Sequence, residues 1–538
     1  MELRDHPKRW IALAGVALGT SLVIMDATIA NVALPVIITD LNLTPTQAEW
    51  MNAAYSLVFA SLMLLSGRLG DLYGRKTMFL IGISGFTLSS LAVGFAPDPG
   101  ILIAARLAQG ISAAMVLPAT LSSINALFRG QERPVAFAVY GATIGGMAAL
   151  GPLIGGWLAA SVSWRWAFWL NLPFGLLTLA LAASTLPETR DPQLRRGLDI
   201  PGTILATLGL GCVVFGLIEA TTFGWWRQAD GSWSPIPFAI ALGLGLLLSF
   251  TIVEAQRGRT HRPVLAHLGL FRLRTFRYGA IAAFIVHLGE FGLLFTLPLV
   301  LQGAMGYGPL GTGGLILALA VGAFAASGLV PALTRRIGQR DVVRVGLGLE
   351  MGAVALLSVT LPSPPWLLSA LMFAYGTGVG LATAQLTSVG LAEVPRKLSG
   401  EASGLQATVR QLGSALGVAL LGGLLITSLT GGTDQRLRDA GLPPQTRSSI
   451  VETVRGSVGA TIPDLAHDPH LAGAPAGAAE SVVGLASEAM VSAARLTTGA
   501  AAGFLALGLL STIALPALRD EPLTSDDAKP VKMRPELP

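Results

Sequence analysis

The stretch WIALAGVALGTSLVIMDATIANVALPV, residues 10–36, decides the fold class of this chain. A helix that crosses a hydrocarbon core of ~30 Å needs ~20 mostly apolar residues. This stretch exceeds that length, and Asp26 is the only ionisable side chain within it. It follows Lys8 and Arg9 as a signal peptide would, but it is too long, lacks a small-residue cleavage site and is followed by more apolar runs. We therefore expect a retained membrane-spanning helix.

The composition of the whole chain favours the same class. Of 538 residues, 52% are hydrophobic and only 12% are charged, whereas an average soluble domain is about a quarter charged. This balance excludes a string of soluble domains, and it leaves too few charges for a disordered chain or for nucleic-acid binding. The single cysteine, Cys212, excludes a disulfide framework, a cysteine-ligated metal cluster and a CxxC redox pair. The prediction is an all-α integral membrane protein whose partner is the lipid bilayer.

Reading the rest of the chain for such runs predicts fourteen transmembrane helices. The approximate spans are 10–36, 48–66, 77–96, 101–127, 135–160, 166–186, 201–222, 236–253, 276–301, 311–333, 342–361, 365–392, 402–430 and 495–518.

The lysines and arginines test this count independently, because cytoplasmic loops retain positive charge. With these spans, 27 of the 36 Lys and Arg residues fall in alternate loops and both ends, and only six fall in the other loops. An odd number of spans would scramble this alternation. The pattern predicts a multi-pass protein of the cell membrane with both termini in the cytoplasm.

The loops are short except for one, and their lengths suggest the domain organisation. The predicted parts are an N-terminal six-helix bundle (1–190), two inserted helices with their loops (191–260), five helices of a C-terminal bundle (261–430), an extracellular segment (431–494), the last helix of that bundle (495–518) and a disordered cytoplasmic tail (519–538). In the extracellular segment, Ile450, Val451, Val454 and Val458 fall at helical spacing. Either a helical hairpin against the outer surface or a solvated insertion fits this pattern.

Between the second and third spans stands GRLGDLYGRK, residues 67–76. Gly67 and Gly74 permit a tight turn between closely packed helices. Asp71 and Arg75 supply charges that could bind neighbouring helix ends. The spacing resembles the Gly-x-Leu-x-Asp-x-x-Gly-Arg-Lys signature of the major facilitator superfamily, with no departure at its key positions.

Further stretches resemble one branch of this superfamily, the fourteen-helix drug:proton antiporters. They are MDATIANVALP (25–35), WRWAFWLNLPFG (164–175), VLAHLGLFRLRTF (264–276) and SGLQATVRQLGSALGVA (403–419). In addition, RLAQGISAA (106–114) resembles the superfamily's fourth-helix arginine motif, and GATIGGMAALGPLIGG (141–156) resembles the antiporter motif of its exporters. The resemblance covers nearly all of the chain except 431–494 and the tail. It implies two pseudo-symmetric six-helix bundles plus two inserted helices, multidrug efflux, the proton as coupling ion with no other cofactor, and a monomer.

The fifth span contains Gly151, Pro152, Gly155 and Gly156. Small residues at this spacing let helices pack backbone to backbone, and the proline adds a bend. The resemblance implies that this helix seals one side of a cavity, and ordinary helix packing is the alternative.

Ionisable residues within spans are costly, at about 2.5–3.5 kcal/mol each on insertion scales, so each calls for a partner or a task. Asp26 lies near the middle of the first span, and Arg106 on the fourth is its obvious partner, although it lies nearer the outer end. Burial favours a neutral carboxyl, and a nearby arginine favours the ionised one. An acid whose partner approaches and withdraws is therefore a natural proton carrier, and a purely structural ion pair is the alternative.

An internal repeat adds a second acid. PALTRRIGQR, residues 331–340, reads as a degenerate copy of residues 67–76 with an offset of 264, and the same offset carries Asp26 onto Glu290. We expect Glu290 to face a central cavity as a second proton site or a cation contact. His287, one turn before it, is expected to assist it.

The expected cargo is a small hydrophobic or cationic drug or dye, and export of a lipid or of an endogenous natural product in antibiotic self-resistance is the alternative. The residues expected to line the substrate cavity are Asn31, Tyr55, Phe59, Gln109, His287, Phe291 and Arg410. An enzyme is disfavoured because no nucleophile–base pair, metal cluster or phosphate loop stands at membrane depth. A receptor or scaffold would have no use for acids inside the membrane.

Overall fold

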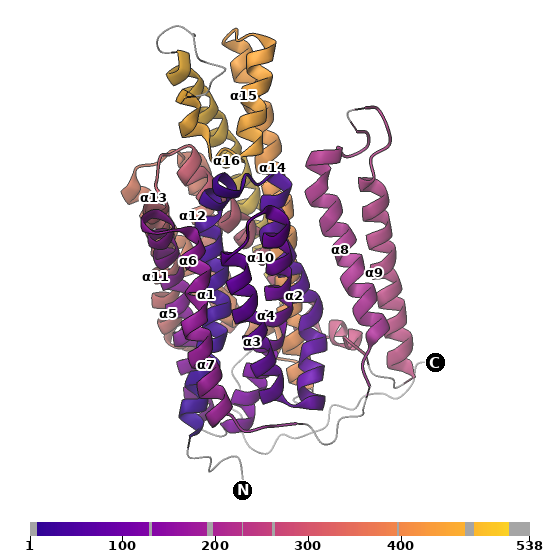
Figure 1. Ribbon diagram of the computed structural model, residues 1–538. Helices are drawn as coiled ribbons and strands as arrows, with labels where there is room; N and C mark the ends of the chain where they lie inside the picture. Colours follow the sequence, from indigo (N-terminus) through magenta and orange to yellow (C-terminus); the bar gives the residue numbers. More distant parts are fainter. Residues whose placement is uncertain are drawn as a thin grey trace.

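The computed structural model describes residues 8–128, 132–190, 197–228, 230–260, 264–394, 398–467 and 478–515. Within these ranges the chain is helical throughout, and its β-structure is limited to one isolated bridge between Arg227 and Trp233. The helices stand side by side as a bundle (Figure 1). The all-α prediction is thus confirmed for the described part of the chain.

The helices are bounded as follows. In chain order they are α1 (Arg9–Leu41), α2 (Pro45–Tyr73), α3 (Arg75–Gly94), α4 (Pro99–Leu127), α5 (Glu132–Ser161), α6 (Trp164–Trp169), α7 (Asn171–Thr185), α8 (Ile200–Phe223), α9 (Ile236–Arg259), α10 (Arg274–Gly303), α11 (Pro309–Ile337), α12 (Gln339–Thr360), α13 (Pro365–Gly390), α14 (Ser399–Asp439), α15 (Pro444–Gly456) and α16 (Ala478–Ser511), with short 3₁₀ turns at Leu268–Arg272, Ile462–His467 and Thr512–Ala514.

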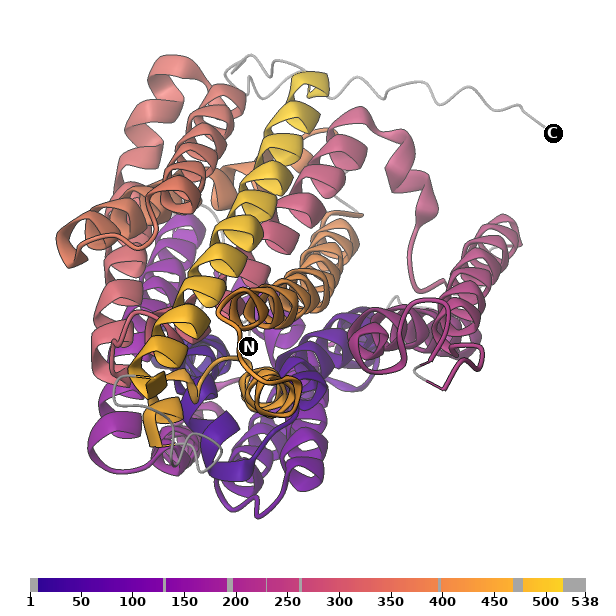
Figure 2. The ribbon, with the colours of Figure 1, turned by 90° about the horizontal axis from the view of Figure 1, so that it is seen from above.

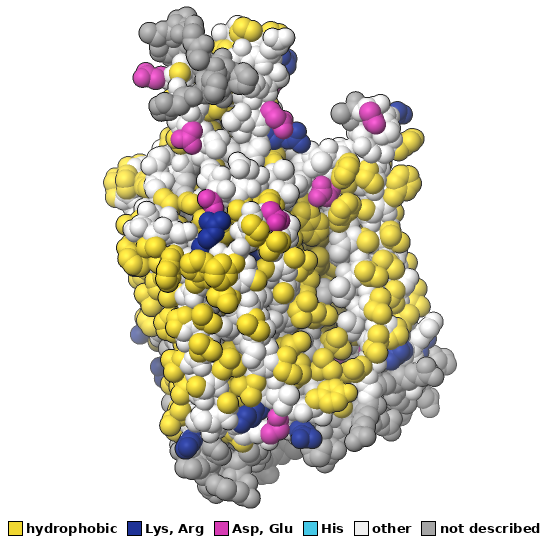
Figure 3. Space-filling model, in the orientation of Figure 1, with side chains coloured by type: hydrophobic (Ala, Val, Ile, Leu, Met, Phe, Trp, Pro, Cys, Tyr) yellow, Lys and Arg dark blue, Asp and Glu magenta, His cyan; other side chains and the backbone are white. Residues whose placement is uncertain are grey.

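Thirteen helical segments in the described ranges are long and apolar enough to cross a membrane. They overlap every predicted span except the fifth, with α6 and α7 together forming the sixth. The fifth span lies within α5, and Leu150–Ser161 is a shorter apolar segment of that helix. On the side of the molecule that Figure 3 shows, apolar side chains cover the bundle in a broad belt. Because such a surface is unfavourable in water, the chain is a multi-pass membrane protein.

The bundle has two ends. Its basal face is the end at which α1 begins, and its distal face is the end at which α1 stops (Figure 1). An ion pair of 2.8 Å joins Arg9 to Glu132 at the basal face. At the distal face, Asp40 accepts from both Arg165 at 2.7 Å and the Trp164 ring nitrogen at 2.9 Å.

Part of the segment 431–494 is helical and projects from the distal face (Figure 1). It contains the end of α14, the whole of α15 and the first turns of α16. Ile450 and Val454 of α15 are fully buried, which explains their helical spacing. In this region α14 packs on α15 and on α16. Both α14 and α16 extend beyond the predicted spans. Residues 468–477 and the tail 519–538 lie outside the described residues.

Two sets of helices meet along the middle of the molecule. In the first half, α1 packs on α5 and α7, and α4 packs on α2 and α3. In the second half, α10 packs on α14 and α16, and α13 packs on α11 and α12. The halves adjoin where α5 meets α11, α2 meets α14 and α1 meets α10. The pair α8–α9 stands to one side, with α8 packed on α2 and α14 (Figures 1 and 2).

Candidate functional site

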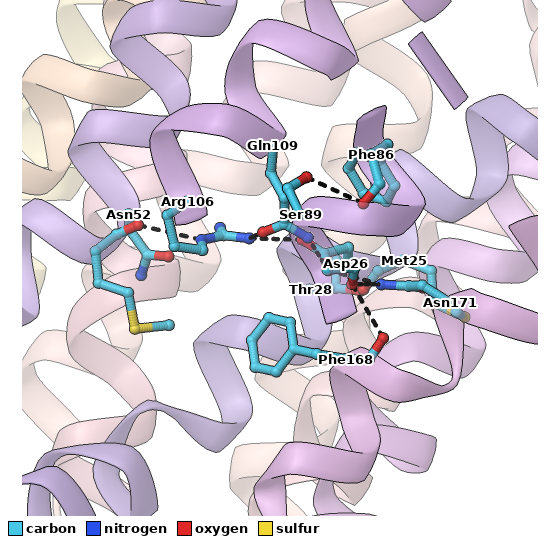
Figure 4. Close-up of polar contacts among 12 residues, drawn as sticks. Met25, Asp26, Thr28, Asn52, Phe86, Ser89, Arg106, Gln109, Phe168 and Asn171 are labelled. Carbon is cyan, nitrogen blue, oxygen red and sulfur yellow. Dashed lines mark hydrogen bonds and ion pairs between the residues drawn. The ribbon is translucent and has the colours of Figure 1, made fainter. Parts of the chain in front are cut away.

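Asp26 of α1 and Arg106 of α4 form an ion pair in the interior of the first half (Figure 4). The Arg106 Nη1 atom lies 2.6 Å from Asp26 Oδ2, and the two side chains are 1% and 0% exposed. The long arginine side chain therefore closes the gap that the sequence positions left open. A pair this deeply buried needs further hydrogen bonds to offset the loss of water.

The other carboxyl oxygen of Asp26 accepts those further hydrogen bonds (Figure 4). Gln109 Nε2 donates to Asp26 Oδ1 at 3.2 Å, and Asn171 Nδ2 donates to it at 2.9 Å. Asn171 also donates to Ser90 Oγ at 2.7 Å. The acid thus accepts from donors on two helices, α4 and α7.

Asn171 is a site residue that sequence reasoning missed. It is the first residue of α7, directly after the break between α6 and α7 at Leu170. That break lets its side chain reach Asp26 from the side opposite Arg106. The available signal is Asn171 itself, a polar amide in the otherwise apolar stretch 166–175.

Arg106 joins this network to the space between the two halves. Its Nε donates to the Met51 carbonyl at 3.3 Å, and its guanidinium lies 4.5 Å from the centre of the Tyr55 ring. A cation over an aromatic face is attracted by the negative face of the ring. One guanidinium therefore contacts both the buried carboxylate and an aromatic side chain of α2.

A cavity of about 140 Å³ lies beside Tyr55, between the halves. It is lined by Val23, Ile24, Ala27, Thr28, Asn31, Asn52, Tyr55, Ser56, Phe59, Arg106, Phe291, Leu294, Gln411 and Val418. Its walls are mostly apolar, with a polar patch where Asn52 donates to Asn31 at 2.9 Å. Such a surface suits an apolar molecule with one or two polar groups.

Four of the seven residues predicted for the cavity line it, namely Asn31, Tyr55, Phe59 and Phe291. The other three lie elsewhere in the structure. Gln109 is turned toward Asp26, His287 Nδ1 lies 3.0 Å from the Ala283 carbonyl oxygen, and Arg410 donates to Thr387 Oγ1 at 2.6 Å.

Glu290 belongs to a second polar cluster, inside the second half. Its Oε2 lies 3.8 Å from His287 Nδ1, and its Oε1 has no hydrogen-bond partner among the described residues. Arg410 on α14 and Glu350 on α12 are the other ionisable groups near it. Glu290 is buried here and is not among the residues that line the cavity.

The GRLGDLYGRK turn lies at the basal face between α2 and α3. Asp71 and Arg75 form an ion pair of 2.9 Å, and Arg75 Nη1 donates to the Ser122 carbonyl at 3.4 Å. Gly74 has a φ of 124°, a conformation that side chains disfavour. Glu188, after α7, accepts from the backbone nitrogen of Lys76 at 3.1 Å. All these partners lie in the first half, so the turn binds that half together.

The Gly–Pro run of α5 lies at the distal junction of the halves. A side chain at Gly151 would strike Thr28 of α1, and one at Gly155 would come within 3.1 Å of the Ile29 backbone. A side chain at Gly156 would strike the Pro309 carbonyl at the start of α11. Nearby, Gln302 Nε2 of α10 donates to the Val32 carbonyl at 3.1 Å. The distal side of the cavity is therefore closed by backbone-to-backbone contacts.

Two adjacent glycines of α11 test this closure. A Cβ at Gly313 would strike the Pro152 carbonyl, whereas one at Gly314 would meet open space. We expect Gly313→Ala to lower the free energy of unfolding by about 1–3 kcal/mol through overpacking. Gly314→Ala is the matched control and is expected to be neutral or slightly stabilising. Thermal unfolding in detergent measures both, and equal shifts would contradict close packing of α5 on α11.

A hydrogen bond at the basal face joins the loop before α10 to α14. Its partners are His267 Nδ1 and a carboxyl oxygen of Glu401, which also accepts from the His267 backbone nitrogen at 3.1 Å. The Glu401 carboxylate raises the pKa of His267, against the effects of partial burial and of nearby Arg68. This contact is strongest below the raised pKa and weakens as the pH rises through it.

Comparison with known proteins supplies the family. The Major Facilitator Superfamily model matches residues 16–418. The chain is 36% identical to the puromycin resistance protein pur8 of Streptomyces alboniger, over 84% of this chain and 87% of that protein. It is 31% identical to the multidrug resistance protein Stp of Mycobacterium tuberculosis (strain CDC 1551 / Oshkosh), over 84% of each chain.

A solved structure has the same fold. It is a bacterial homolog of the human lysosomal transporter Spinster in an inward-facing, occupied conformation, with a TM-score of 0.61 at 16% identity, over 95% of this chain and 98% of that one. The family match runs from α1 into α14 and confirms the predicted resemblance. The chain therefore belongs to the Major Facilitator Superfamily and is a transporter rather than an enzyme.

Proposed function

We propose that this protein is a proton-coupled antiporter of the cell membrane that exports hydrophobic, often cationic, drugs or dyes. The observation that carries the proposal is the position of Arg106, which pairs with buried Asp26 and also lines the cavity between the halves. A molecule in that cavity contacts Arg106. Arg106 is the ion-pair partner of Asp26, the only acid in the apolar core of α1. Binding of substrate and protonation of Asp26 therefore act on the same guanidinium.

The mechanism is alternating access. Proton entry from outside neutralises Asp26 and weakens its hold on Arg106, and the two halves then rock about the cavity. Coupling follows if proton and substrate favour opposite states of the protein. In this orientation the basal face is cytoplasmic, as are both termini, and the distal face is extracellular. Glu290 serves as a second proton site or cation contact, and neither a metal nor an organic cofactor takes part.

The proposed architecture has fourteen transmembrane helices, arranged as two related six-helix bundles with α8 and α9 inserted between them. Three correspondences support the repeat. The packing partners of α1–α7 in the first half match those of α10–α16 in the second. Gly74 and Gly338, offset by 264, both have positive φ at a turn between helices. Asp26 and Glu290 lie at similar depths in α1 and α10. The protein is proposed to work as a monomer.

A second candidate cargo is a natural product made by the producing cell itself, or a lipid. The 36% identity to a puromycin resistance protein favours the natural product, since that relative's name ties it to one antibiotic. The helices that project from the distal face are the feature that could guide a lipid tail outward. Both alternatives use the same cavity and the same proton site.

Transport into inverted membrane vesicles tests the proposal. Cationic, neutral and lipidic compounds are offered with and without an acid interior, which corresponds to the extracellular side. One proton that moves down one pH unit supplies about 1.4 kcal/mol, enough for about tenfold accumulation. We expect cationic apolar dyes to accumulate only with the gradient. Gradient-independent uptake would contradict proton coupling, and uptake confined to lipids or to one antibiotic would favour the second candidate.

A further inference from the structure

A buried acid at the distal face has no place in the mechanism above. Glu49 stands one turn into α2, its side chain is fully buried, and neither carboxyl oxygen has a hydrogen-bond partner among the described residues. An ionised carboxylate in such a place would lack every compensation that buried charges require. The burial of Glu49 is therefore compatible only with a protonated, neutral carboxyl.

The neighbours of Glu49 come from both halves of the transporter. On α14, a Cβ at Gly422 would lie 2.7 Å from Glu49 Oε1, and one at Gly423 would lie 3.9 Å from it. The same Gly422 position faces Phe295 of α10 at 2.9 Å. The carboxyl group is thus covered by two helices of the second half, at the distal junction where α2 meets α14.

The charged groups around this point are few. From α8, Glu219 faces Glu49, and its Oε1 accepts from the Trp50 ring nitrogen at 3.0 Å. Arg455 of α15 is occupied with the Thr221 carbonyl at 3.1 Å and Glu452 at 3.5 Å. The faces of α10 and α14 present Phe295, Gly422 and Gly423, which carry no charge.

We propose that Glu49 is a further proton-binding site, which must be protonated for the distal side to close and which exchanges its proton with the extracellular side alone. It rests on the alternating-access part of the proposed function. When the distal ends of α2 and α14 separate, water reaches the carboxyl and it can ionise. When they close, it must take the proton back.

The direction of the effect follows from linkage. At any pH above the ordinary pKa range of an exposed carboxyl, the closed state binds one proton more than the open state. Raising the pH therefore favours distal opening, by up to about tenfold per pH unit for one proton. Because Glu49 gains and loses its proton on the same side, it adds nothing to the number of protons transported.

The test measures distal opening directly in lipid nanodiscs. Spin labels are placed at Val162 on the loop after α5 and at Leu310 on α11, both exposed, in a chain whose single cysteine is replaced by Cys212→Ser. The populations of short and long label distances are followed across pH. In the otherwise native chain we expect the open population to rise with pH.

The Glu49→Gln variant keeps the shape of a neutral acid but cannot ionise. We expect its opening equilibrium to be less steep by up to about tenfold per pH unit, while the proton-to-substrate ratio of transport is unchanged. Glu219→Gln, the matched control, is expected to keep the steep dependence, and so is Glu49→Asp, which also serves if the glutamine variant fails to fold. The proposal would be overturned if the open population depended equally steeply on pH in Glu49→Gln and in the parent chain. It would also be overturned if the open population of the parent chain did not depend on pH. Loss of proton-driven transport with the label response intact would instead count against the antiport mechanism.

Discussion

Asp26→Asn is expected to abolish export driven by a pH gradient while leaving downhill exchange of substrate in place. Asn has nearly the shape of Asp, and its single amide oxygen can still accept from Arg106, but it cannot take up or release a proton. Without that step the pH gradient has no means of favouring one state over the other. With a gradient of one pH unit, accumulation should fall from about tenfold to the level of the no-gradient control.

Proteoliposomes that contain purified protein and a fluorescent cationic dye measure both activities. Asp40→Asn is the matched control, since Asp40 lies on the same helix but is 43% exposed and paired with Arg165 at the distal surface. That variant should accumulate dye normally. Full gradient-driven accumulation by Asp26→Asn would show that the proton is carried elsewhere, with Glu290 as the next residue to test.

The fold followed from the sequence because span length is a local property. Each apolar run had to form a helix of membrane length, whatever its neighbours were. The pairing of Asp26 with Arg106 was also predictable, because a charge inside a membrane needs a partner and few were present. The sequence could not show that the Arg106 side chain extends far enough to place its Nη1 atom 2.6 Å from Asp26 Oδ2.

Which residues surround this pair was harder to predict, because it depends on the face of a helix that each side chain occupies and on helices that are distant in the sequence. Gln109 was expected in the cavity, but it stands three residues after Arg106 and therefore shares its helix face, which is turned to Asp26. Asn171 reaches the site only because the helix breaks between α6 and α7. Glu49 stands near a span end, where water is expected. It is buried by Gly422 and Phe295, more than two hundred residues away in the chain.

Removing the positive charge of Arg106 should have the largest effect on the stability of the protein. In Arg106→Met, Asp26 keeps its bonds from Gln109 and Asn171 but loses its counter-ion within the membrane. Breaking a buried ion pair in this way typically costs about 3–5 kcal/mol, because the remaining charge is left uncompensated. Adding Asp26→Asn to the same chain removes that charge, so the double variant should recover much of the loss. Reversible unfolding of the three variants in mixed micelles gives the coupling between the two residues.

The surface pair of Asp40 and Arg165 supplies the comparison, since its 2.7 Å separation is nearly the same but both side chains are partly exposed. Arg165→Met should cost at most about 1 kcal/mol, because water screens and replaces the lost partner. If Arg106→Met costs no more than this, Asp26 must already be neutral beside its arginine. That result would also contradict the proton switch at Asp26. Protonation of Asp26 can change the conformational equilibrium only if it breaks a strong ion pair with Arg106. A large coupling at Asp26 and Arg106, with a small one at the surface, is what a proton-operated switch requires.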